Sequence, residues 1–126
     1  MESLTLLQLN KRIASLVMTG ATQNVWITAE LSDVIVRGGH CYMELLQKDS
    51  ASGATVAKAR GAIWANRFVD IRQRFLTATG QDFRTGLKVM LCASVSMHPV
   101  YGMSLVINAV NPEYTMGDIV RRRNEM

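Results

Sequence analysis

The sequence predicts a mainly β protein with helices, and three observations support this class. Apolar residues recur at helical spacing in the first 18 residues and then alternate with a period of two in five later segments. A second segment with helical spacing separates the third alternating segment from the fourth. The resulting order is a leading helix, three strands, a helix and two strands. This is the order of the five-stranded OB-fold barrel, a small Greek-key architecture, here with an additional N-terminal helix.

The composition is that of one globular domain. The chain has 126 residues, of which 48% are hydrophobic and 19% charged, which excludes disordered and low-complexity classes. No stretch approaches the ~18 consecutive apolar residues of a membrane-spanning helix, and no secretory leader is recognisable. Cys41 and Cys92 are too few for a disulfide framework. We therefore expect reduced cysteines, a cytoplasmic location and no membrane partner.

The first element expected is a helix over residues 5–18. Thr5 and Gln8 have the spacing of a capping box, and Gly20, which follows the last turn, is the expected stop. The helix carries one apolar stripe, which we expect to cover one end of the barrel: Leu6, Leu9, Ile13, Leu16 and Val17.

Alternation then predicts strands over residues 25–32, 40–45 and 55–65. Gly38-Gly39 separates the first two strands, and the polar segment 48–54 closes a hairpin between the second and third. The inward-facing sets are Val25, Ile27, Ala29 and Leu31; Cys41, Met43 and Leu45; and Ala57, Ala59, Gly61 and Ile63.

The second half continues with a helix over residues 67–79, for which Asn66 is the expected N-cap and Gly80 the stop. Strands over 87–97 and 103–110 follow, with a turn at Pro99. A last helix over 115–126 is expected to begin at Thr115 as its cap. The apolar side of the middle helix is marked by Phe68, Ile71, Phe75 and Leu76.

The outward faces of the first three strands interleave aromatic and basic side chains, which is the pattern of an oligonucleotide-binding surface. Aromatic faces stack on unpaired bases, and basic groups neutralise phosphates. Residues 50–88 carry seven basic and two acidic side chains, a mild footprint for a polyanion. The candidate nucleic-acid-binding residues are Trp26, Thr28, Arg37, His40, Tyr42, Lys58, Arg60, Trp64 and Tyr101.

Each of these features also has a purely structural interpretation. The two tryptophans could pack inward or under the leading helix, His40 could serve only its turn, and the charge could be a solvated surface. We find no catalytic constellation, because the carboxylates are scattered and His40 and His98 lack nearby ligands at metal spacing. No catalytic residue, metal or cofactor is therefore expected in this chain.

Several motifs in order resemble the N-terminal domain of exodeoxyribonuclease VII large subunits. Residues 24–34 (NVWITAELSDV) resemble its first strand, and 39–43 (GHCYM) its next motif. The chain departs from the family at Ala29, at Cys41 and in a longer hairpin over 47–54. The other matching segments are 4–10, 58–64, 86–89, 94–96, 101–102 and 117–123.

The resemblance implies that residues 1–114 form an OB-fold domain that grips single-stranded DNA. It implies that residues 115–126 begin a connector helix to an absent catalytic domain. The parent enzyme of that family degrades single-stranded DNA to acid-soluble oligonucleotides and pairs with several small subunits, which would contact the absent part of the chain. Two rival functions remain open: an OB-fold that binds RNA or a protein in another assembly, and, ranked last, a stand-alone enzyme.

Overall fold

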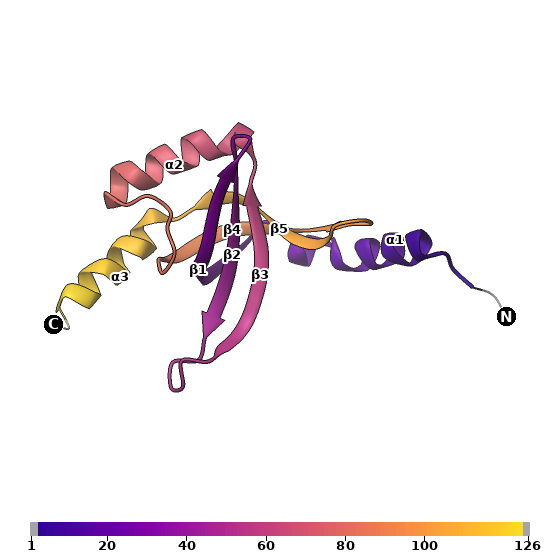
Figure 1. Cartoon of the computed structure of the whole chain (residues 1–126), viewed down its shortest axis with the longest axis horizontal. Helices are drawn as coiled ribbons and strands as arrows, with labels where there is room; N and C mark the ends of the chain where they lie inside the picture. Colours follow the sequence, from indigo (N-terminus) through magenta and orange to yellow (C-terminus); the bar gives the residue numbers. More distant parts are fainter. Residues whose placement is uncertain (1–2, 125–126) are drawn as a thin grey trace.

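Five strands close into a barrel in the computed structural model, which describes residues 3–124 (Figure 1). The predicted fold class is confirmed, with one helix ahead of the barrel and one between the third and fourth strands. Within the described residues, no helix is long and apolar enough to span a membrane. In chain order the elements are α1 (Leu6–Val17), the 3₁₀ turn η1 (Gly20–Thr22), β1 (Val25–Arg37), β2 (His40–Lys48), β3 (Thr55–Ile63), α2 (Ala65–Thr79), β4 (Lys88–His98), β5 (Gly102–Val110) and α3 (Pro112–Asn124).

The strand order around the barrel is β1-β2-β3-β5-β4, with β4 returning to β1. The long strand β1 makes closure possible, because Val25 to Glu30 pair with β4 while the later part, as far as Arg37, pairs with β2. The register against β2 shifts between Leu31 and Asp33, an irregularity that bends the strand from one neighbour to the other. Strands β3 and β5 close the barrel in parallel. This is the connectivity of the OB-fold.

The core is built mainly from the side chains that the alternation predicted to face inward. Two of them are exposed instead: Val25, which begins β1, and Ala57, which lies in the part of the β2–β3 hairpin beyond the pairing of β3 with β5. Helix α2 lies across one end of the barrel (Figure 1) and adds Phe68, Ile71 and Phe75 to the core. Leu76, expected on the same side, is instead 40% exposed, so the apolar face of α2 is narrower than predicted. The buried barrel residues include Leu31, Cys41, Met43, Leu45, Ile63, Val89, Leu91, Ala93 and Ile107.

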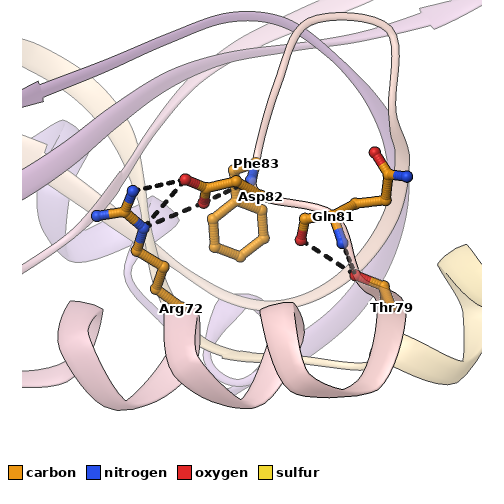
Figure 2. Close-up of polar contacts among 5 residues, drawn as sticks. All are labelled: Arg72, Thr79, Gln81, Asp82 and Phe83. Carbon is orange, nitrogen blue, oxygen red and sulfur yellow. Dashed lines mark hydrogen bonds and ion pairs between the residues drawn. The ribbon is translucent and has the colours of Figure 1, made fainter.

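Polar contacts fix the turn between α2 and β4 (Figure 2). Gly80 ends α2 in the left-handed region with φ 69°, as predicted. The Arg72 guanidinium binds the Asp82 carboxylate with an Nη2–Oδ2 distance of 2.5 Å, and the Phe83 N–H donates to the same carboxylate. The Thr79 hydroxyl oxygen accepts the backbone N–H of Gln81. The turn thereby holds the Phe83 ring in the core, stacked on a phenylalanine of α2 at 4.4 Å.

Helix α1 has the predicted capping box between Thr5 and Gln8, but it does not cover the barrel. It projects along the β4–β5 hairpin (Figure 1), and none of its residues is buried. The Asn10 amide donates to the carbonyl of Pro99 at the hairpin tip. The expectation was wrong because the hairpin extends beyond the barrel and offers α1 a nearer surface. Gly20 does not cap α1 either, since it begins η1.

Two further helix starts differ from the prediction. Trp64, not Asn66, is the N-cap of α2, and its extended backbone leads directly from β3 into the helix. Helix α3 begins at Pro112 rather than at Thr115. Thr115 is buried inside the helix, and its hydroxyl donates to the carbonyl of Lys88. The predicted residues 125–126 of this helix lie outside the described residues.

Candidate nucleic-acid interface

Three of the candidate aromatic side chains form one exposed cluster, which we call the aromatic corner: His40, Tyr42 and Trp64. The ring centroids of His40 and Trp64 are 5.3 Å apart, and those of Tyr42 and Trp64 are 6.2 Å apart. His40 and Tyr42 alternate on β2, whose register places Tyr42 opposite Ala62 on β3, two residues before Trp64. Tyr42 is 39% and Trp64 41% exposed. The prediction that these rings face outward is therefore confirmed, and neither belongs to the core.

The turn before β2 fits closely against the start of α2. The Nδ1 atom of His40 accepts the backbone N–H of Ala65 at 2.8 Å, which ties β2 to the first turn of α2. Gly39 adopts φ 82°, and a Cβ built there would lie 3.3 Å from the Ala65 Cβ. A side chain at this position would be strained in both respects. Arg37 pairs with His40 across the turn and is exposed.

The charged residues on the same face are not equivalent. The Lys58 ammonium lies 3.3 Å from the Glu44 carboxylate, which also accepts a hydrogen bond from the Ser32 hydroxyl at 3.0 Å. These contacts, led by the Ser32 hydrogen bond, lower the pKa of Glu44. Arg60 has no carboxylate within ion-pair distance among the residues that the structure describes. Its guanidinium therefore remains the more available phosphate-binding group.

Tyr101 lies at the tip of the β4–β5 hairpin and is 77% exposed. Its ring is 4.6 Å from that of His98, whose Nδ1 accepts the backbone N–H groups of Val100 and Tyr101. The Arg60 guanidinium approaches the Tyr101 carbonyl at 3.5 Å, so the hairpin tip borders the β3 side of the candidate face. A shallow groove between β3 and β5 is lined by Glu44, Lys58, Arg60, Met103 and Ser104.

Trp26 and Thr28 lie on a different part of the barrel. Both belong to the half of β1 that pairs with β4, where Trp26 is opposite Cys92. The β1 partner of Tyr42 is Ile35. Ile35 lies nine positions after Trp26 on the same strand, which corresponds to up to about 30 Å of extended chain. Trp26 is outward-facing and 51% exposed, as predicted. From the outward faces of the first three strands one would expect Trp26, Tyr42 and Trp64 to form one continuous stacking surface, but Trp26 lies apart from the other two rings.

Sequence reasoning overlooked Glu44, although it alternates with Tyr42 and so had to face outward. The opposed positions Asp33 and Glu44 bring two carboxylates to this part of the surface, a pairing that depends on strand register. Among the described residues, no group of three or more His, Cys, Asp or Glu side chains has the geometry to hold a metal ion.

A closed five-stranded barrel with an outward aromatic and basic face is typical of an OB-fold nucleic-acid-binding domain. Comparison with known proteins agrees with this class. The chain belongs to the OB-fold nucleic acid binding domain family, whose model matches residues 4–111. It is 34% identical over 127 residues to the exodeoxyribonuclease 7 large subunit of Deinococcus radiodurans, which confirms the resemblance seen in its motifs. The alignment covers 98% of this chain and only 30% of that protein.

Solved structures similar to the chain include two of the mitochondrial single-stranded DNA binding protein Rim1 from S. cerevisiae. The first has 16% sequence identity and a TM-score of 0.48, and covers 69% of this chain and 88% of the other. The second has 15% identity and a TM-score of 0.46, with 71% and 92% covered.

Proposed function

We propose that this chain binds single-stranded DNA on the β2–β3 face of its barrel. The observation that carries the proposal is the aromatic corner, exposed on the same face as Arg60, whose guanidinium has no carboxylate partner among the residues that the structure describes. Aromatic faces stack on any unpaired base, and the arginine neutralises a phosphate. Neither contact reads the hydrogen-bonding edge of a base, so binding requires no particular sequence. Duplex DNA is excluded because its base faces are already stacked.

DNA rather than RNA is proposed because the curated relative is named as an exodeoxyribonuclease large subunit. In this proposal the chain supplies DNA binding and no hydrolysis of its own. A longer protein containing it degrades single-stranded DNA in the cytoplasm and engages small subunits through other segments. Residues from about Thr115 onward then lead toward a catalytic domain.

The test is a fluorescence anisotropy titration with a labelled single-stranded oligonucleotide of mixed sequence. The same sequence as RNA and as duplex DNA provides the comparison, and a chelator is added in a parallel series. We expect preference for single-stranded DNA, unchanged by the chelator, with no hydrolysis. Trp64→Ala is expected to weaken binding by about 1–3 kcal/mol. Val69→Ala is the matched control, because Val69 is 75% exposed on α2, outside the aromatic corner.

Equal or tighter binding of the RNA would favour the RNA-binding alternative. A large drop in melting temperature for Trp64→Ala would instead place that ring in a structural role. Chelator-sensitive cleavage of the oligonucleotide that copurifies with the chain through successive columns would contradict the assignment of binding without catalysis.

A further inference from the structure

The planes of the aromatic corner are nearly perpendicular to one another. The Tyr42 and Trp64 rings are inclined at 83°, and the His40 and Trp64 rings at 89°. A base that stacks on a ring lies parallel to it. Two bases stacked on Tyr42 and Trp64 would therefore lie at about a right angle to each other, whereas neighbouring bases of a stacked single strand are nearly parallel.

We propose that the aromatic corner selects single strands that turn sharply and unstack at this point, and so favours pyrimidine tracts over stacked adenine tracts. This inference rests on the proposed function and specifies its substrate. Breaking an adenine–adenine stack has a free-energy cost, whereas thymine tracts stack weakly and bend easily. The preference arises from the angle between the rings and requires no hydrogen bond to a base edge.

The surrounding structure holds the angle in place. Tyr42 is fixed by the ladder to Ala62 on β3. The Trp64 carbonyl accepts the N–H groups of Arg67 and Phe68 in the first turn of α2, which anchors its backbone. His40 contributes an edge contact to Trp64, and its Nδ1 accepts the backbone N–H of Ala65, the first residue of α2. His40 is therefore a positioning residue that keeps the two exposed rings at a right angle.

The basic side chain of the face fits this geometry. Arg60 and Trp64 are separated by four positions on the same side of the chain, with Ala62 and its partner Tyr42 between them. An arginine four positions before Trp64 can neutralise phosphates of the single-stranded DNA on one side of the bend in that DNA. A phosphate contact is the same for thymine and adenine tracts. Arg60 should therefore raise the affinity for both tracts without changing the preference between them.

The experiment compares oligo-dT and oligo-dA of equal length in anisotropy titrations at one salt concentration. Wild type is expected to prefer oligo-dT by several-fold, because an adenine stack must be broken before its two bases can reach both rings. Trp64→Ala and Tyr42→Ala each leave only one of the two rings proposed to stack on bases, so each should bind oligo-dT more weakly and bring the dT/dA ratio toward one. Arg60→Ala should weaken both complexes about equally. Trp26→Ala, which removes an exposed ring elsewhere on the barrel, should keep the wild-type ratio.

His40 is tested by the same ratio, with circular dichroism to confirm folding. His40→Ala should lower it, and His40→Asn, whose amide oxygen can accept the Ala65 N–H, should retain more of it. Equal wild-type affinity for the two tracts, or a ratio unaffected by Trp64→Ala and Tyr42→Ala, would overturn the inference while leaving single-strand binding intact. Absence of binding to either tract would overturn both proposals.

Discussion

Replacing Glu44 by glutamine is expected to tighten single-strand binding. The Glu44 carboxylate holds the Lys58 ammonium at 3.3 Å, and the hydrogen bond from Ser32, followed by Lys58 itself, lowers the pKa of this carboxyl. Glu44 is therefore an anion at neutral pH, next to the groove in which a phosphate would lie. Glutamine keeps an oxygen that can accept the Ser32 hydrogen bond, but it loses the charge. The variant thus frees Lys58 for a phosphate and removes a repulsive group.

The size of the effect follows from counterion release. One additional phosphate contact steepens the slope of log K against log salt by about 0.7 for a single strand. The advantage of Glu44→Gln over wild type should therefore shrink by about 2.6-fold between about 50 mM and about 200 mM salt. Anisotropy titrations with one labelled oligonucleotide across this salt range measure both the affinity and the slope.

Asp70→Asn is the matched control for this prediction. Asp70 holds Arg74 at 3.3 Å on the exposed surface of α2, so the variant makes the same change in net charge and frees a cation away from the aromatic corner. The reasoning is refuted if Asp70→Asn tightens binding as much as Glu44→Gln does. It is equally refuted if Glu44→Gln leaves both affinity and salt slope at their wild-type values.

Three further predictions concern the scaffold. Phe75→Ala should lower the free energy of unfolding by about 3–5 kcal/mol in a denaturant titration, because Phe75 is 1% exposed and stacks on Phe83. Cys41 is fully buried, and burial raises its pKa to about 11, so only about one thiol in a thousand is ionised at pH 8 and alkylation should require denaturant. The Arg72 hydrogen bond lowers the pKa of Asp82 below its usual 3.8, so the pair stabilises the fold above that pH and the contribution disappears as acid protonates the carboxylate. Thermal melts against pH should accordingly show a shallower acid decline for Asp82→Asn than for wild type.

The barrel could be predicted because strand periodicity depends on local geometry. Side chains alternate strictly across a pleated strand, so the apolar positions Cys41, Met43 and Leu45 identify one buried face of β2 without knowledge of its neighbours. The position of α1 could not be predicted in this way. Its apolar stripe shows that the helix packs against something, and the choice between the barrel end and the β4–β5 hairpin depends on how far that hairpin extends.

The same distinction separates the two tryptophans. Strand parity predicted that Trp26 and Trp64 both face outward, and both do. Their mutual distance depends on which strand each part of β1 pairs with, and the exchange of partners occurs at the irregularity near Leu31. Alternation in the sequence contains no information about that register. The aromatic corner therefore includes His40, which follows from its place beside Tyr42 on β2, and omits Trp26.

Electrostatics show why the charge of a segment locates a binding face only approximately. Three basic residues of the 50–88 region have carboxylate partners, namely Lys58, Arg72 and Arg74. Arg60, Arg67, Arg84 and Lys88 have none within the described part of the chain. The guanidinium groups of Arg60 and Arg67 lie near main-chain carbonyls of the turn before β5 and of β5 itself. Arg60 and Arg67 should therefore attract a polyanion to the place where β3 meets β5, beside Tyr42 and Trp64, whereas Arg72 and Arg74 on α2 are neutralised by their carboxylate partners. Single-stranded DNA that is attracted to this side by its phosphates would contact the exposed rings of Tyr42 and Trp64. The angle between those rings would then determine which DNA sequences bind most tightly.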